Sequence, residues 1–200
     1  MFKSTPFADA LRKPRRRLLS VVAAVGVLLF PAQSATAQAP RSEAVDALRA
    51  AFLFNFAKFT TWPAVSDLDT SIKFCIQANT IDQTAFAGWG KKRIQNRPVR
   101  VAFFSQFNEG EFANCSIMFV SDEPQGIDME GLRNFAIEHN TLFVSDIEGF
   151  SASGGHIELY EQSRRLRFKV NLGALDKAKL SLGAGVLNLA EIVGTTGAPK

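Results

Sequence analysis

The most regular pattern of apolar positions lies between residues 42 and 63. Apolar side chains recur there at steps of three and four residues, the period of one helical face, at Val45, Leu48, Phe52, Phe56 and Phe59. Ser42 can accept hydrogen bonds from the free amides of the first turn. Trp62-Pro63 ends the predicted helix, because a residue before proline is pushed out of helical geometry.

The stretch AAFLFNFAKFTTWP inside this segment has three interpretations. It could seek a membrane, stack against a flat ligand, or form the wall of a globular core. The helix is too short to span a bilayer and lacks a basic polar face. We therefore expect the phenylalanines to be buried in the core.

The middle of the chain alternates between short apolar strands and helical segments. Ile72, Phe74 and Ile76 occupy one face of a predicted strand, and Cys75 points to the other. Asp128 is placed to cap a later helix. The further elements are three strands and two helical segments, predicted at residues 99–104, 116–120, 141–145, 82–89 and 129–139. This alternation predicts an α/β fold: a single compact domain with a mixed, mostly parallel sheet flanked by helices.

The C-terminal part changes character. Two β-like runs, 156–160 and 166–170, flank Glu161-Gln162-Ser163-Arg164, which predicts a β-hairpin. Apolar residues at helical spacing then predict a closing helix over residues 174–192. In that helix Gly183-x-Gly185 would serve close helix packing rather than nucleotide binding.

The first 37 residues show the three parts of a secretory signal peptide. A basic start is followed by thirteen mostly apolar residues, 18–30, and by small residues leading to an A-x-A site, Ala35-Thr36-Ala37. Thirteen residues fall short of the roughly 20 that a spanning helix needs. We therefore expect cleavage before Gln38, which leaves residues 38–200 as one exported domain.

Removing this segment changes the charge of the protein. Six of the 23 basic residues and one of the 19 acidic residues lie in it, so 17 basic and 18 acidic residues remain. The formal net charge of +4 is thus a property of the leader. It is no footprint of nucleic-acid binding, and no DNA or RNA partner is expected.

Cys75 and Cys115 are the two cysteines, and both lie in the exported part. In an oxidising compartment an even pair is interpreted first as a disulfide. Such a bond would stabilise the fold by roughly 4 kcal/mol in the loop-entropy model. The alternative is a thiol oxidoreductase, but such enzymes set two thiols close together, as in C-x-x-C. We predict a structural disulfide.

The sequence offers few groups for catalysis. His139 and His156 are the two histidines, and neither has the spacing of a metal or catalytic motif, so each is interpreted as a surface or hydrogen-bonded histidine. Asp146 and Glu148 form an acidic pair that falls short of a calcium site, because further oxygen ligands are missing. We expect no metal and no cofactor. An enzyme is disfavoured without being excluded, since triads assemble from distant positions.

Two segments carry a family resemblance. AAFLFNFAKFTTWP, followed by SDIEGFSASGGHIELYEQSRRLRFKVNLGALDKAKLSLGAGVLNLAEIV, resembles the YfiR family of periplasmic proteins. Its members share a signal peptide, an aromatic helix ending in W-P, and a tail with a glycine pair and an R-F-x-I-N motif. The match covers about residues 43–193. Lys169 departs from the family, which commonly has an acidic residue there.

The resemblance implies a compact α/β domain that acts by binding and has no catalytic activity. Studied members of the family restrain a membrane-bound diguanylate cyclase by contacting its periplasmic part, and an outer-membrane lipoprotein can sequester the repressor. The expected function is therefore a periplasmic regulator of cyclic-di-GMP synthesis and biofilm behaviour. A homodimer is an open alternative for the oligomeric state.

The candidate partner-binding surface is the loop over residues 146–156 with the adjoining hairpin. Small residues around Phe150 can let a partner approach closely; alternatively, Phe150 folds back onto the core. The candidate residues are Phe150, Gly154, Gly155, Arg167 and Asn171.

A second hypothesis is a periplasmic small-ligand-binding domain that feeds an envelope complex. In it Phe54, Phe56 or Trp62 lines a pocket and Arg167 holds an anion.

Overall fold

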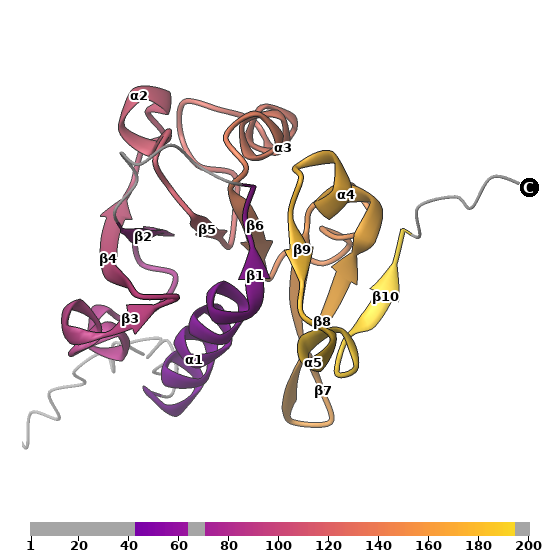
Figure 1. Cartoon of the computed structure of the whole chain (residues 1–200), viewed down its shortest axis with the longest axis horizontal. Helices are drawn as coiled ribbons and strands as arrows, with labels where there is room; N and C mark the ends of the chain where they lie inside the picture. Colours follow the sequence, from indigo (N-terminus) through magenta and orange to yellow (C-terminus); the bar gives the residue numbers. More distant parts are fainter. Residues whose placement is uncertain (1–42, 64–70, 195–200) are drawn as a thin grey trace, which may run out of the picture. The chain divides into compact units, whose positions relative to one another are not determined.

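Helix α1 (Glu43–Phe59) is the first element in the part of the chain that the computed structural model describes, residues 43–63 and 71–194 (Figure 1). Its first turn carries Glu43 and Asp46, which suit the positive end of a helix. The helix ends where strand β1 (Thr60–Thr61) begins, slightly earlier than predicted. The predicted signal peptide, its cleavage site and the cap at Ser42 lie outside the described residues.

Eight strands form one sheet in the order β10-β8-β7-β6-β5-β2-β4-β3. Neighbouring strands are parallel except for the pairs β7/β8 and β3/β4. The strands are β2 (Ile72–Gln77), β3 (Arg93–Ile94), β4 (Arg97–Phe104), β5 (Ile117–Val120), β6 (Leu142–Ser145), β7 (Ile157–Gln162), β8 (Arg165–Asn171) and β10 (Glu191–Val193). A separate antiparallel pair joins β1 to β9 (Ser181–Leu182). The predicted α/β class with a mixed, mostly parallel sheet is confirmed.

Helical segments connect the strands. Two short 3₁₀ helices, η1 (Gln83–Phe86) and η2 (Trp89–Lys91), follow β2, and α2 (Glu109–Phe112) precedes β5. Helix α3 (Met129–Glu138) precedes β6. Asp128 caps α3 as predicted, since its carboxylate accepts a hydrogen bond of 2.7 Å from the amide of Gly131.

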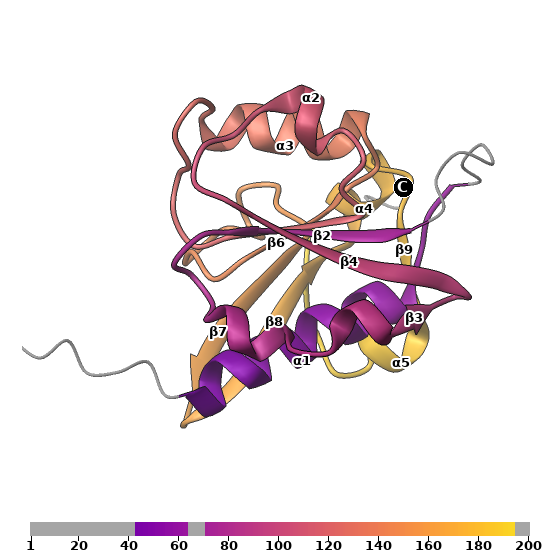
Figure 2. The same cartoon turned by 90° about the vertical axis from the view of Figure 1, so that its left-hand side faces the viewer.

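The sheet separates two apolar layers, with α1 and α5 on one face and α2 and α3 on the other (Figure 2). Strand β2 shows the division, because successive side chains of a strand point to opposite faces. Ile72, Phe74 and Ile76 pack into the α1 layer, and Cys75 packs into the layer of α2 and α3. This is the arrangement that the alternation in the sequence predicts.

The predicted hairpin is present as strands β7 and β8. Their antiparallel register pairs Gln162 with Arg165, so the loop consists of Ser163 and Arg164 alone. Both loop residues have positive φ, 51° and 61°, as a tight two-residue turn that matches the twist of the strands requires.

The predicted closing helix over residues 174–192 is wrong. The segment forms helix α4 (Leu172–Lys177), strand β9, helix α5 (Ala184–Leu187) and strand β10. Lys179 adopts a φ of +53°, which ends the helical path after α4. Leu182 then pairs with Thr60 of β1, and Ile192 pairs with Val170 of β8. Gly183 precedes α5 and lies against Phe59, instead of packing inside a long helix.

Candidate functional site

The loop between β6 and β7 holds Phe150, the centre of the predicted partner surface. Phe150 is only 3% exposed, and its ring packs edge-on against Phe143 with 4.8 Å between ring centroids. Of the two alternatives open from the sequence, the structure has the aromatic side chain folded onto the core. Direct contact of its ring with a partner would require the loop to open.

The two glycines of the loop have different roles. A Cβ on Gly155 would lie 2.1 Å from a ring carbon of Phe150, a distance that no side chain tolerates. Gly154 has a φ of +98°, a conformation that side-chain-bearing residues rarely adopt. Gly155 therefore makes room for Phe150, and Gly154 turns the chain beside Arg133.

Asn171, at the end of β8, ties this loop to the hairpin. Its side-chain oxygen accepts a 2.9 Å hydrogen bond from the amide of Ala174 and so caps α4. Its side-chain amide donates to the carbonyl of Ser151 at 2.7 Å. Both ends of the side chain are thus used in holding local structure.

Glu158 of β7 is a buried carboxylate beneath the same loop, with 1% of its surface exposed. It accepts hydrogen bonds from the amide and hydroxyl of Ser151, at 3.0 and 2.8 Å, and from the ammonium group of Lys169 at 2.9 Å. Burial by itself would raise the pKa of Glu158, but the bonds from Lys169 and Ser151 outweigh it and hold that pKa below its usual value. Glu158 also raises the pKa of Lys169.

His156 is a buried, hydrogen-bonded histidine. Its Nδ1 accepts a hydrogen bond of 2.9 Å from the amide of Phe143 on the neighbouring strand. Burial lowers the pKa of His156 to about 4, and a hydrogen bond with the backbone of Ala174 offsets only part of that effect. The imidazole is therefore neutral at neutral pH and acts as a structural acceptor.

Arg167 is set apart from the other candidate residues. It is exposed on β8 and lies opposite Tyr160 in the hairpin register. Tyr160 donates a hydrogen bond of 3.0 Å to Glu191 of β10. The pKa of Tyr160 is raised, first by burial and then by this bond to Glu191. The structure thus brings Phe150, Gly155 and Asn171 together beneath the loop and leaves Arg167 on the open face of the hairpin.

A shallow cavity of about 660 Å³ adjoins the loop. Gly154 and Asn171 line it, and its charges come from Glu130, Arg133, Asp176 and Lys177. Polar and charged groups of both signs meet there, which suits a hydrated surface contact more than a closed ligand site.

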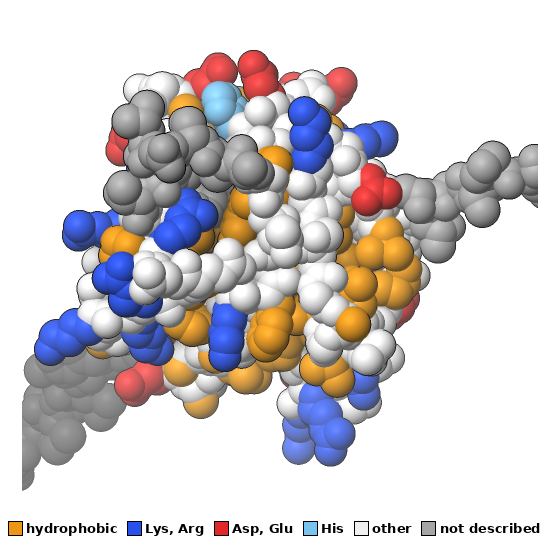
Figure 3. Space-filling model, in the orientation of Figure 1, with side chains coloured by type: hydrophobic (Ala, Val, Ile, Leu, Met, Phe, Trp, Pro, Cys, Tyr) orange, Lys and Arg blue, Asp and Glu red, His pale blue; other side chains and the backbone are white. Residues whose placement is uncertain are grey.

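An apolar groove of about 470 Å³ lies on the other layer, between α1, α5 and β8. Leu48, Phe59 and Leu189 line it and are 44%, 43% and 75% exposed. Phe52, Phe168 and Val186 also contribute to its walls. Figure 3 shows apolar side chains gathered over this region. Exposed large apolar residues that cluster, rather than scatter, are typical of interaction surfaces.

The groove exists because α1 is rotated about its own axis, so that its buried face differs from the one that the apolar stripe predicts. Its buried face consists of Asp46, Ala50, Leu53, Phe56 and Ala57. Asp46 is drawn inward because its carboxylate accepts a hydrogen bond of 2.9 Å from the amide of Asp82. The expected core burial of the phenylalanines is therefore correct for Phe56, partly correct for Phe52 and Phe54, which pack against the core while half-buried, and wrong for Phe59, which is exposed. Val45 and Leu48, on the same stripe, are exposed as well.

The aromatic residues expected to form one ligand pocket do not share a site. Phe54 lies by a smaller groove of about 270 Å³ with Trp89 and Lys92, and the ammonium group of Lys92 lies 4.8 Å from its ring centroid. Phe56 lines the apolar groove from its buried side. Trp62 instead donates a hydrogen bond to the carbonyl of Ser116 at 3.3 Å. Arg167 lines none of the three cavities described above.

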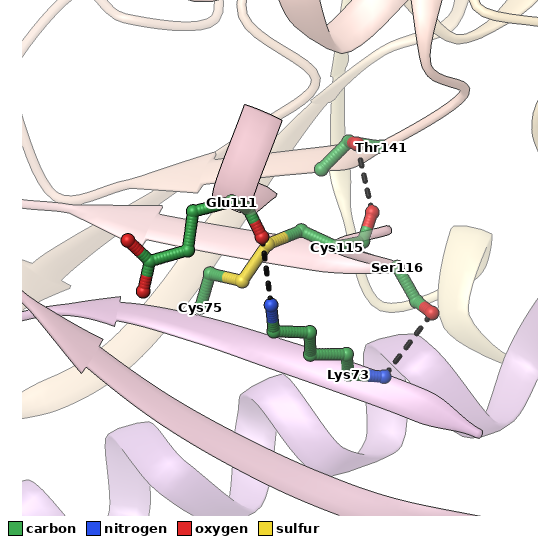
Figure 4. The surroundings of a disulfide bond; sticks show 6 residues. All are labelled: Lys73, Cys75, Glu111, Cys115, Ser116 and Thr141. Carbon is green, nitrogen blue, oxygen red and sulfur yellow. Dashed lines mark hydrogen bonds between the residues drawn. A yellow bond between two sulfur atoms is a disulfide. The ribbon is translucent and has the colours of Figure 1, made fainter. Parts of the chain in front are cut away.

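The predicted disulfide joins Cys75 of β2 to Cys115, just before β5 (Figure 4). The two Cα atoms lie 6.0 Å apart, within the usual range for a disulfide. Both cysteines are buried. The carbonyl of Cys115 accepts a 2.8 Å hydrogen bond from the hydroxyl of Thr141, which ties the bridge to the start of β6. The bond staples neighbouring parallel strands.

Asp146, one of the two acidic residues weighed in the sequence as a cation site, has a structural partner. The carboxylate of Asp146 lies 2.9 Å from the guanidinium of Arg49 on α1. Arg49 in turn lies 3.5 Å from Asp46. Asp146 is therefore used in an ion pair that fixes α1 to the end of β6.

These features define an α/β domain with a mostly parallel sheet, a buried disulfide and an open apolar groove. Among residues 43–63 and 71–194, no helix is long and apolar enough to cross a membrane. A family model described as YfiR/HmsC-like matches residues 46–191, and the chain belongs to this family. The family consists of periplasmic proteins connected with the regulation of cyclic-di-GMP signalling.

No curated protein matches the chain. Among solved structures, the chain is similar to a conserved domain protein from Vibrio cholerae O1 biovar El Tor strain N16961, with a TM-score of 0.48 and 9% sequence identity. The alignment covers 74% of this chain and 59% of that one.

Proposed function

We propose that the protein is a non-enzymatic periplasmic regulator that binds the periplasmic part of an inner-membrane diguanylate cyclase and restrains it. Membership of the YfiR/HmsC-like family over residues 46–191 supports this function. The Cys75–Cys115 disulfide agrees with it, because such bonds persist in oxidising compartments such as the periplasm. An outer-membrane lipoprotein that sequesters the regulator is a further partner in this scheme.

The observation that carries the proposal is the apolar groove between α1, α5 and β8. Leu48, Phe59 and Leu189 expose apolar surface to water, and this exposure does not stabilise a folded monomer. The volume of about 470 Å³ is enough for one or two large side chains of a partner. Buried aromatic and aliphatic anchors of this kind supply most of the binding energy at protein interfaces.

The hairpin and its loop form a second candidate surface. Here Arg167 is the exposed member on the hairpin, while Gly154 and Asn171 line the polar cavity next to the loop. Phe150 and Gly155 would act indirectly, by holding the shape of the loop. A partner at this surface would meet mixed charges, so its binding would weaken as the salt concentration rises.

The test is capture of the purified periplasmic part of each membrane diguanylate cyclase encoded with the protein. Leu48→Asp should weaken capture at least tenfold, because it places a charge in the groove. Ile192→Ser is the matched control, since Ile192 is 38% exposed but lies on β10, outside the groove. Arg167→Glu tests the hairpin surface in the same assay.

The outcomes separate the surfaces from the function. If Arg167→Glu alone weakens capture, the hairpin is the binding surface and the groove is not. If neither variant weakens a measurable interaction, both surface assignments are wrong. If no cyclase is captured by the unaltered protein, the regulatory function itself is contradicted.

A small-ligand-binding domain that feeds an envelope complex is the second candidate function. The groove favours it, because a volume of about 470 Å³ and mostly apolar walls are typical of ligand pockets. Asn55 supplies a polar group in the wall. This function predicts that an apolar or aromatic metabolite raises the melting temperature of the protein, and that Phe59→Ala abolishes the shift. A broad metabolite screen without any shift would contradict it.

A further inference from the structure

Three metal-ligating side chains meet at the surface of the α2 and α3 layer. Glu109 is the first residue of α2, Glu138 is the last residue of α3, and His139 follows it as the helix cap. One ligand atom from each lies within 4.8 Å of the others. No sequence motif indicates this group, because 28 residues separate Glu109 from the Glu138-His139 pair.

The imidazole of His139 is held in place without using its Nε2 atom. Its ring packs against Phe135 with 4.4 Å between centroids, and its backbone amide bonds to the carbonyl of Phe135 at 2.9 Å. The Nε2 atom is buried and has no hydrogen-bond partner among the described residues. A carboxylate oxygen of Glu109 lies 3.7 Å away, too far for a hydrogen bond. Apart from this contact with Glu109, the described residues offer the Nε2 atom no partner, so the atom is available as a metal ligand.

The charges around the site favour a cation. Two carboxylates and the negative end of the α3 helix dipole face the same point. In residues 43–63 and 71–194, no lysine or arginine forms an ion pair with Glu109 or Glu138. Figure 3 shows a histidine side chain near acidic side chains at the top of the molecule, with basic side chains close by. Within the described residues, the contact between His139 and Glu109 is the one ion pair of this group, so the carboxylate of Glu138 has no cationic partner there.

We propose that Glu109, Glu138 and His139 bind a divalent transition-metal ion of the Zn²⁺ type. One imidazole with two carboxylates is a donor set that suits Zn²⁺, whereas Ca²⁺ and Mg²⁺ prefer oxygen ligands alone. Ligand bonds of roughly 2.0–2.2 Å bring tetrahedral ligand atoms about 3.4 Å apart. The two exposed glutamates can close to that spacing by rotating. The remaining position stays open to water, and the ion joins α2 to the end of α3.

The test uses protein expressed from the full coding sequence, purified without a histidine tag and stripped of metal with a chelator. Competition with a chromogenic Zn²⁺ chelator should give one bound ion per chain. His139→Ala and Glu109→Gln should each weaken binding by roughly tenfold or more, since each removes a ligand. Glu111→Gln is the matched control, because Glu111 is an exposed acid in the same short helix but outside the group.

Two readouts besides affinity locate the ion. Zn²⁺ should shift the NMR resonance of the His139 Nε2 atom, and it should raise the melting temperature of the unaltered protein but not of Glu109→Gln. Glu109 is exposed, so this variant is expected to fold. Absence of saturable Zn²⁺ binding, or equal binding by His139→Ala, would overturn the proposal.

Discussion

The ring of Phe150 lies directly over the α-carbon of Gly155, at a distance that leaves no room for a methyl group. A Cβ on Gly155 would come within 2.1, 2.3 and 2.4 Å of three ring carbons. The backbone amide of Gly155 also donates a 2.9 Å hydrogen bond to the carbonyl of Phe150. The two residues close the loop on itself, and this contact holds the ring against Phe143.

Gly155→Ala should therefore destabilise the fold by about 2–3 kcal/mol, because the ring must leave its place. The free energy of unfolding in urea measures this. Gly90→Ala is the matched control, since a Cβ there meets nothing within 4 Å. In the background Phe150→Leu, Gly155→Ala should cost less than in the unaltered protein, because the two residues are in contact. Additive effects would contradict the direct contact.

The strands of the fold could be predicted from sequence where a strand is buried on both faces. The β5 and β6 segments are short continuous apolar runs, and the structure buries every residue of each. The alternation in β2 also gave the side of the sheet to which Cys75 points. The information in these cases is local, so the period of the side chains was sufficient.

The tail could not be predicted, because its structure depends on distant pairing. Leu175, Ala178, Leu182 and Val186 have helical spacing and are all buried, but they belong to separate short elements. Leu182 pairs with Thr60, more than 100 residues earlier in the chain. A periodic pattern does not contain such a pairing, nor the positive φ of Lys179.

The candidate site shows the same division between local and distant information. The glycine pair around Phe150 was recognisable, because glycine marks close approach of the backbone. The groove was missed, since the stripe of α1 indicated burial and the inward position of Asp46 depends on the amide of Asp82. Leu48 and Phe59 are exposed because of that rotation of the helix about its axis, which cannot be predicted from the sequence alone.

Removal of the disulfide should cost stability without loss of the fold. Replacing Cys75 and Cys115 together by alanine opens a loop with a sequence separation of 40, worth about 4 kcal/mol in the loop-entropy model. Both sites are buried and apolar, so alanine leaves no unpaired polar group there. Urea unfolding of the double variant, and of the unaltered protein with and without reductant, measures the loss. Equal stability with and without the bond would contradict a structural role.

Acid should destabilise the protein through His156. Its pKa is about 4 in the folded state, against 6.5 as the ordinary value, so the unfolded chain binds a proton that the folded chain does not. The contribution of His156 to the free energy of unfolding is therefore fully present above pH 6.5. It falls by about 3 kcal/mol as the pH drops toward 4. His156→Gln keeps an acceptor for the amide of Phe143 but cannot be protonated.

Urea unfolding at pH 7, 5.5 and 4.5 checks this prediction. The unaltered protein should lose more stability than His156→Gln across that range, although the variant starts lower at pH 7 because its side chain fits less well. Parallel curves for the two proteins would show that His156 does not titrate in this way.

Lys169 should matter for stability because it neutralises the buried carboxylate of Glu158. Lys169→Met removes the charged hydrogen bond of 2.9 Å and should cost about 2 kcal/mol at pH 7. The folded-state pKa of Glu158 is lowered, so its contribution is present above the ordinary pKa and is lost as the pH falls through the lowered value. The difference between variant and unaltered protein should therefore shrink in acid.

The control for this experiment is Lys177→Met, which changes an exposed lysine of α4. It should leave the free energy of unfolding within about 0.5 kcal/mol of the unaltered value. If both variants have the same effect at every pH, the pairing with Glu158 does not contribute to stability.

The apolar groove should be dispensable for folding, although its residues are large and hydrophobic. Leu189 is 75% exposed, so Leu189→Ser removes little surface that folding had buried and should change the free energy of unfolding by less than about 0.5 kcal/mol. Phe56→Ala, in the buried wall of the same groove, should cost about 3–5 kcal/mol. Loss of cyclase capture by Leu189→Ser at unchanged stability would mean that the exposed rim serves binding. A large loss of stability in Leu189→Ser would instead mean that the groove is closed in solution, and that Leu189 belongs to the core.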